Sequence, residues 1–143
     1  MEAKPKFGID KLLFGMKRPD VEALYGKPDR QFKDDEQNMI YLYDKAQWRL
    51  TFYEDEEFRL GYVISSNPEL RLAGHEIIGK PADSVKHQLE KHYNNWEVED
   101  FDMTRNHFNE PNWLILQSEF GLVTKIEMGV VAKNLDDFDW KFK

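Results

Sequence analysis

Alternating apolar and polar residues predict β-strands in both halves of the chain. Over residues 48–53, Trp, Leu and Phe alternate with Arg, Thr and Tyr, which is the period of a strand with one buried face. Residues 39–43 and 58–64 are also rich in β-forming side chains, and the acidic run 54–57 is a turn. In the second half, further strands are predicted over residues 96–103, 113–116 and 122–131. The short links between consecutive strands predict antiparallel meanders.

A short helix is predicted ahead of the strands in each half. Pro19 suits a helix start, where its missing N–H costs nothing, and Gly26 suits the C-terminal stop. In the second half Val85, Leu89 and Tyr93 recur every fourth residue and therefore lie on one helix face.

The two halves echo one another. Phe14-Gly15 matches Ile78-Gly79 at a spacing of 64, and Trp48 matches Trp113 at a spacing of 65. A chain that repeats itself at about half its length indicates two copies of one supersecondary unit.

We therefore expect an α+β fold, in which two αβββ repeats form one antiparallel sheet with the helices on one face. The repeats cover about residues 10–66 and 74–132, and a C-terminal arm of residues 133–143 completes a single domain, 1–143. The apolar positions of both repeats predict a core of Val21, Leu24, Trp48, Leu50, Phe52, Val85, Leu89, Trp113 and Leu116.

Charge and composition narrow the classes of partner. The net charge of -7 divides evenly between the halves, with no basic arm to contact phosphates, so we expect no nucleic acid partner and favour a basic protein. The absence of cysteine excludes disulfides and thiolate chemistry. No apolar stretch has the length of a signal peptide or a membrane span, so we expect a cytoplasmic protein without a membrane partner.

Motifs for catalysis or metal binding are missing. His87 and His92 are five residues apart, about 140° around a helix, which is poor geometry for a shared metal. The acidic run 54–57 lacks the alternation of a calcium loop, and no serine lies in a Gly-x-Ser-x-Gly turn. Converging carboxylates stay open as a hydrolytic site, although no motif marks them. We expect no enzyme, no cofactor and no metal.

The aromatic residues suggest a binding surface. If Ile40, Leu42 and the core residues of 48–52 face the helices, other side chains share the opposite face as candidate partner-binding residues, namely Tyr41, Tyr43, Arg49 and Tyr53. The acidic turn next to them would form a charged rim of Glu54, Asp55, Glu56 and Glu57. Alternatively, these tyrosines only cover a sheet face or pack under the C-terminal arm.

The first half also resembles a known repeat. Gly15, Val21, Leu24, Gly26 and Pro28 follow the order of the helix-and-turn phrase of the β-lactamase-inhibitor-protein type, which SmpA/OmlA-type outer-membrane assembly lipoproteins share. The second half lacks the closing Gly-x-Pro of this phrase. The resemblance implies proteins that bind other proteins and do no chemistry. In size, acidity and lack of cysteine, the chain also resembles bacterial toxin-immunity proteins.

Together these features favour a non-enzymatic protein-binding module, most concretely a cytosolic immunity or inhibitor protein that neutralises a basic toxin domain. The alternative is a small-ligand-binding or sensor domain with an aromatic pocket around Trp48 and Trp113.

Overall fold

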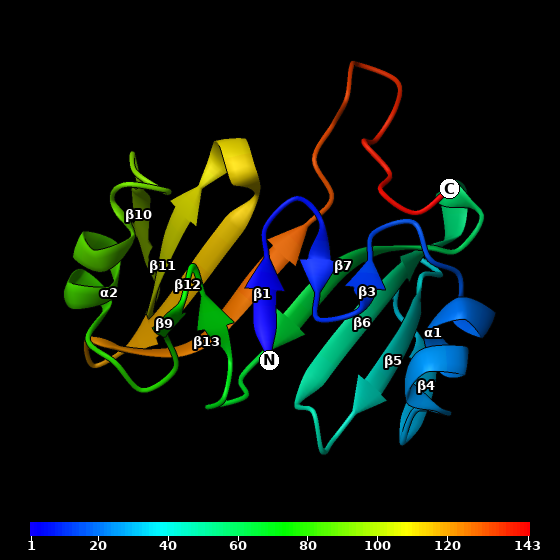
Figure 1. Cartoon of the computed structure of the whole chain (residues 1–143), viewed down its shortest axis with the longest axis horizontal. Helices are drawn as coiled ribbons and strands as arrows, with labels where there is room; N and C mark the ends of the chain where they lie inside the picture. Colours follow the sequence, from blue (N-terminus) through cyan, green and yellow to red (C-terminus); the bar gives the residue numbers. More distant parts are fainter.

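The main element of the fold is an eight-stranded antiparallel sheet (Figure 1). A computed structural model describes all 143 residues. The strand order is β10-β11-β12-β13-β7-β6-β5-β4, so β7 and β13 join the two halves at the centre of the sheet. The strands are β4 (Arg30–Lys33), β5 (Met39–Tyr43), β6 (Trp48–Tyr53), β7 (Arg59–Ser65), β10 (Glu97–Asp100), β11 (Thr104–Asn109), β12 (Leu114–Glu119) and β13 (Leu122–Gly129).

A second, smaller sheet has five strands in the order β3-β2-β1-β8-β9. They are β1 (Glu2–Lys4), β2 (Gly8–Ile9), β3 (Leu12–Leu13), β8 (Arg71–Leu72) and β9 (His75–Glu76). The pair β1–β8 is parallel and joins the N-terminus to the segment between the two halves. The sequence did not predict this sheet, because strands of two or three residues are too short to show a period.

Both predicted helices are present, as α1 (Arg18–Tyr25) and α2 (Ala82–Leu89). The N–H of Lys17 donates to Asp20 Oδ2 at 3.0 Å and caps the start of α1, and Gly26 ends this helix with a φ of 78°. Two single 3-10 turns, η1 (Glu54–Glu56) and η2 (Glu110–Asn112), connect strands. Neither α-helix is long and apolar enough to cross a membrane.

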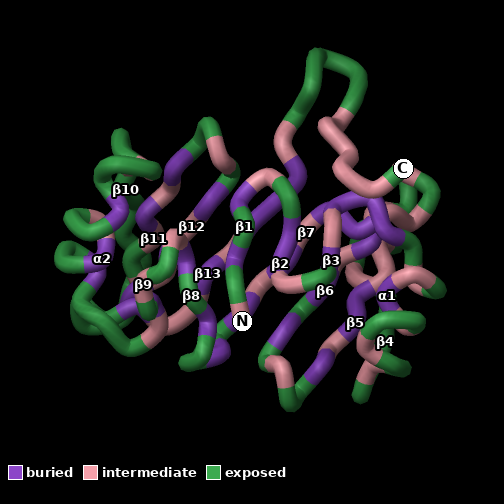
Figure 2. Tube along the Cα trace, in the orientation of Figure 1, coloured by how far each residue is buried: buried purple, intermediate pink, exposed green.

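The core lies between the large sheet on one side and the small sheet and both helices on the other. In Figure 2 the buried stretches, in purple, lie on strands of both sheets and on the two helices. One cluster of 25 buried residues joins all these elements. Leu24 and Trp113 do not belong to it, because they are 43% and 41% exposed. The other predicted core residues are buried, namely Val21, Trp48, Leu50, Phe52, Val85, Leu89 and Leu116.

The α+β class and the antiparallel pairing agree with the sequence prediction, but the predicted unit does not. Each helix is followed by four strands of the large sheet rather than three. The strands also form two sheets rather than one, since the first residues of the chain and residues 71–76 build the small sheet.

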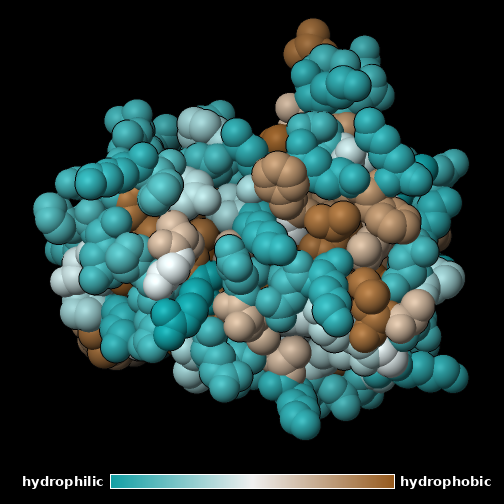
Figure 3. Space-filling view, in the orientation of Figure 1, coloured by the Kyte–Doolittle hydropathy of each residue, from teal (hydrophilic) through white to brown (hydrophobic).

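The C-terminal segment forms a loop that projects from the body and returns to it (Figure 1). Ala132 bridges to Phe138 across the base of the loop. The N–H groups of Lys141 and Phe142 both donate to the carbonyl of Phe14 at 3.0 Å. In Figure 3 the apolar side chains on the visible surface gather beneath this loop, on a face that is otherwise largely hydrophilic. The segment is therefore an ordered arm rather than a strand.

Candidate functional site

Tyr41 and Tyr43 face α1, and not the opposite side of the sheet as predicted. They are 2% and 7% exposed. The Tyr41 hydroxyl donates to Glu22 Oε2 at 2.7 Å, and the Tyr43 hydroxyl donates to the carbonyl of Gly26 at 2.8 Å. Burial, with Glu22 and Asp29 nearby, raises the pKa of Tyr43 to about 12. Both tyrosines hold α1 on the sheet, and a partner has no access to them.

The reason lies in the pairing of β5 with β6. Tyr41 lies opposite Leu50 and Tyr43 lies opposite Trp48, so all four side chains share the helix-facing side. Every residue of β5 is apolar or aromatic, so no polar position sets the phase of its alternation.

Arg49 and Tyr53 do lie on the predicted side, which we call the open face: the face of the large sheet away from the helices. The Arg49 guanidinium lies over the ring of Phe32, 5.8 Å from its centroid. Burial, and then Asp55 and Glu36, raise the pKa of the Tyr53 phenol to about 12. The structure thus brings together only half of the predicted aromatic and arginine set.

The predicted acidic rim forms the turn between β6 and β7. Glu54 and Asp55 are exposed. Glu57 accepts a hydrogen bond from Arg59 at 2.7 Å and lies 3.9 Å from Lys17 Nζ. The bond from Arg59, followed by the charge of Lys17, lowers the pKa of Glu57. The turn begins directly after Tyr53, so its carboxylates flank one end of the open face.

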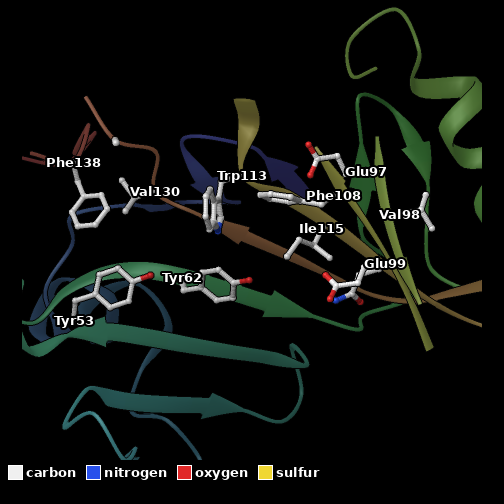
Figure 4. Close-up of a pocket in the computed structure, with 12 residues that line it drawn as sticks. Tyr53, Tyr62, Glu97, Val98, Glu99, Phe108, Trp113, Ile115, Val130 and Phe138 are labelled. Carbon is white, nitrogen blue, oxygen red and sulfur yellow. The ribbon is translucent and has the colours of Figure 1, made fainter. Parts of the chain in front are cut away.

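The open face carries a groove of about 760 Å³, which we call the aromatic groove (Figure 4). Nine of its 12 lining residues are hydrophobic. Its volume lies within the roughly 300–1,000 Å³ of small-molecule sites. The lining residues are Tyr53, Tyr62, Glu97, Val98, Glu99, Asn106, Phe108, Trp113, Ile115, Val130, Ala132 and Phe138.

Two glycines on the central strands let aromatic rings pack directly against the sheet backbone. A Cβ at Gly61 of β7 would lie 2.1 Å from the ring of Tyr53. A Cβ at Gly129 of β13 would lie 2.5 Å from the ring of Trp113. Both approaches are too close for any side chain larger than hydrogen, so the glycines fix where the two rings lie.

Trp113 forms a wall of the groove. It follows η2 in the left-handed conformation, with a φ of 44°, and its ring meets Phe108 edge-on at 5.1 Å. In the first half Gln47, with a φ of 57°, is also left-handed and directly precedes β6 as Trp113 precedes β12. Trp48 and Leu114 are therefore the first residues of corresponding strands, and the sequence match of Trp48 with Trp113 is shifted by one residue from this structural correspondence.

The C-terminal arm forms a second wall. The rings of Phe138 and Tyr53 lie 6.0 Å apart, and Phe138 meets Trp140 edge-on at 5.4 Å. Val130, at the base of the arm, is buried. In Figure 4 Phe138 and Val130 stand on one side of the groove, beyond Trp113. The sequence predicted an ordered arm, but not that the arm would enclose a site.

Polar groups are few and lie in defined places. The Tyr62 hydroxyl donates to Glu127 Oε1 at 2.6 Å, and burial together with Glu127 raises the pKa of this phenol. Tyr62 is therefore neutral across the physiological range. Glu97 and Glu99 of the edge strand β10 are exposed at the far end of the groove. The groove thus has an apolar centre and an acidic end.

A second polar cluster lies on the helix-facing side. His107 Nε2 lies 3.0 Å from Ser118 Oγ, and His107 Nδ1 has no partner. Burial, followed by Lys86 and Arg105, lowers the pKa of His107. The distance suits a serine and its base, and the two residues, only 2% and 3% exposed, line the wall of a mostly polar cleft of about 370 Å³. No three His, Cys, Asp or Glu side chains converge as metal ligands.

Comparison with known proteins adds little to this description. No protein-family model matches the chain. No curated protein matches it either. One similar solved structure is an extracellular protein containing an SCP domain from Bacillus anthracis, with 12% identity and a TM-score of 0.49 over 87% of this chain and 49% of that one. Another is a cysteine-rich secretory protein from Staphylococcus aureus, with 12% identity and a TM-score of 0.47 over 80% of this chain and 43% of that one. The chain thus spans about half the length of these proteins.

Proposed function

We propose that this protein is a non-enzymatic binding module and that the aromatic groove is its site. The observation that carries the proposal is the groove itself, about 760 Å³ in volume with nine hydrophobic residues among its 12. Apolar clefts with a few well-placed polar groups are the usual form of binding sites. The rings of Tyr53 and Trp113 are held in place by the glycines beneath them, so binding costs little ordering of side chains.

The charges around the groove favour a partner with basic and apolar groups. Glu97 and Glu99 lie at one end, and the turn with Glu54 and Asp55 follows Tyr53 at the other. A basic group near either end would gain from these carboxylates, and aromatic faces also attract cations. The net charge of -7 would speed the encounter with such a partner.

A basic segment of another protein is the occupant that we favour. An immunity or inhibitor protein that neutralises a basic toxin domain in the cytoplasm is the concrete form of this proposal. Tyr41 and Tyr43 have no part in it, because they are buried. Tyr53 stays an anchor, as the sequence suggested, and Tyr62, Phe108 and Trp113 take the place of Tyr41 and Tyr43.

The volume of the groove also favours a second candidate, a small aromatic or aliphatic ligand with a cationic group. The predicted pocket around Trp48 and Trp113 would then be a pocket at Trp113 alone, since Trp48 is 3% exposed in the core.

The internal repeat is also part of the proposal. We infer that the halves are two copies of one helix-and-meander unit, extended from three strands to four. The helices α1 and α2 start 64 residues apart. The strands of the large sheet run outward from the central β7–β13 pair in matching order.

A peptide display library tests the proposed function. Wild type should enrich sequences that combine Lys or Arg with aromatic or aliphatic residues, and Trp113→Ala should bind the enriched peptides at least tenfold more weakly. Leu24→Ala is the matched control, since Leu24 is 43% exposed, similar to Trp113, but lies on α1 outside the groove. Peptides that bind wild type and Trp113→Ala equally would refute the groove as the site. Enrichment of no peptide, with fragment binding at Trp113 seen by NMR, would favour the small ligand.

A further inference from the structure

The two edge strands of the large sheet carry opposite charge. The strands β4 and β10 lie at the two ends of the strand order, and all of their residues are exposed. One edge has two basic residues and no acidic one, with the sequence Arg30-Gln31-Phe32-Lys33. The other has three acidic residues and no basic one, with the sequence Glu97-Val98-Glu99-Asp100.

The outer side of each edge strand is free to pair. Each strand pairs with one neighbour, β5 or β11, and no other backbone or side chain of the protein hydrogen-bonds to the backbone of residues 30–33 or 97–100. Such a row of unpaired N–H and C=O groups is a template for another strand.

The charges select which strand pairs with these edges. Two β10 edges would bring carboxylates face to face, and two β4 edges would bring cations together, so like edges repel. The combination of β4 with β10 places opposite charges together. A second copy of this chain therefore offers each edge a complementary strand.

The geometry of the sheet permits this contact. All seven pairings among the eight strands are antiparallel, so β4 and β10 run in opposite directions. A second copy rotated to follow the twist of the sheet would thus add its β10 antiparallel to β4 and continue the sheet. Arg30 lies opposite Leu42, which lies opposite Arg49 of the open face. Glu99 lies opposite Asn106, which lines the groove on the same face. Both charged side chains therefore lie on the open face.

Existing ion pairs leave Arg30, Glu97 and Glu99 available for the contact, although the third acidic residue of β10, Asp100, pairs with Arg105. Arg30 lies 3.6 Å from Asp44, and both side chains are more than 60% exposed. An ion pair so exposed to water stabilises little. Glu97 and Glu99 form no ion pair at all within the chain.

We propose that copies of this protein associate edge to edge, with β4 of one copy pairing with β10 of the next. The two surfaces in contact differ, so the association is head to tail, and it forms linear assemblies unless the copies close into a ring. It depends on exposed charges and therefore weakens as salt rises.

Charge reversal on each edge tests the proposal by sedimentation velocity at low salt. Wild type should show sedimentation coefficients that rise with protein concentration and fall on addition of salt. The double variant Arg30→Glu/Lys33→Glu has two acidic edges. The double variant Glu97→Lys/Glu99→Lys has two basic residues on β4 and two lysines in place of the glutamates on β10. Each variant alone should associate at least tenfold more weakly than wild type.

Mixing provides the decisive result. An equal mixture of the two variants should associate again, because the intact β10 of the first meets the intact β4 of the second. The variant with all four reversals should also associate, since its edges have exchanged charge. Wild type that stays monomeric at millimolar concentration and low salt would overturn the proposal, as would double variants that associate as well as wild type.

Two controls keep this result independent of the binding proposal. Trp113→Ala should leave self-association unchanged, because its ring does not lie on an edge strand. If a reversal variant is misfolded by circular dichroism, Arg30→Gln/Lys33→Gln and Glu97→Gln/Glu99→Gln replace it, with the same expected loss of association. Failure of peptide binding together with intact edge pairing would refute the proposed function alone.

Discussion

The two tryptophans that the sequence matched should differ sharply in their contribution to stability. Trp48 is 3% exposed, meets Tyr25 and Tyr43 edge-on, and donates from Nε1 to Met1 Sδ at 3.3 Å. Trp113 is 41% exposed on the open face. Replacement of each by alanine therefore separates a core residue from a binding-site residue.

The magnitudes follow from the buried areas. A buried tryptophan removes roughly 150–250 Å² from water. At about 25 cal/mol per Å², this corresponds to about 4–6 kcal/mol before allowing for the alanine that remains. We expect Trp48→Ala to lower the free energy of unfolding by about 3–5 kcal/mol, most of the stability of a marginal domain. Trp113 buries little more than half its surface, so its loss should cost about 2 kcal/mol.

Urea unfolding followed by circular dichroism measures both values, since fluorescence changes when a tryptophan is removed. Trp48→Phe and Trp113→Phe are the controls, because they retain an aromatic ring and should recover part of each loss. A cost for Trp113→Ala equal to or above that for Trp48→Ala would show that the assignment of the two rings to groove and core is wrong.

Three further changes probe the groove and the buried titratable groups. Gly129→Ala should push the Trp113 ring away from the sheet, shift tryptophan emission to longer wavelength and lower the free energy of unfolding by about 1–3 kcal/mol. Unchanged emission would contradict the packing of the Trp113 ring on Gly129. The pKa values of Tyr43 and Tyr53 are raised to about 12, so the contribution of these tyrosines to stability should be complete below pH 10 and lost between pH 10 and 12. Urea midpoints measured across this range should fall, and the fall should be smaller in Tyr43→Phe/Tyr53→Phe. The pKa of His107 is lowered from 6.5, so the contribution of this residue to stability should be present above pH 6.5 and lost as the pH falls through its pKa in the folded state. The stability of His107→Gln should therefore depend less on pH in acid than that of wild type, and an unchanged dependence would point to other groups.

Sequence reasoning located the elements well where local signals were strong. Pro19 and Gly26 mark the two ends of α1, and the alternation in residues 48–53 gives β6 and its buried face correctly. Both signals depend on neighbouring residues, so they can be read without knowledge of the tertiary structure.

The site was harder to predict, because it depends on the phase of strands and on pairing between distant segments. In β5 a run without polar residues left the facing of Tyr41 and Tyr43 undetermined. At Trp113 a left-handed turn residue moved the ring from the core to the open face. Phe138 reaches the groove, and Gly129 reaches the ring of Trp113, only through the fold of the arm and the central strands. An aromatic residue at the last position before a hairpin turn, with a glycine on the next strand, was the signal available for Tyr53.

The parallel pairing of β1 with β8 has a consequence for the order in which the chain folds. Ala3 lies opposite Leu72, so nearly half the chain separates the two partners. The N-terminal strand therefore leaves the ribosome long before its partner exists, whereas the meander β4–β7 needs only near neighbours in sequence. Contacts between distant residues carry a large loop-closure cost and form slowly. The strands β4–β7 should consequently assemble first during synthesis, and the first residues of the chain should take their place only after residues 71–72 have emerged.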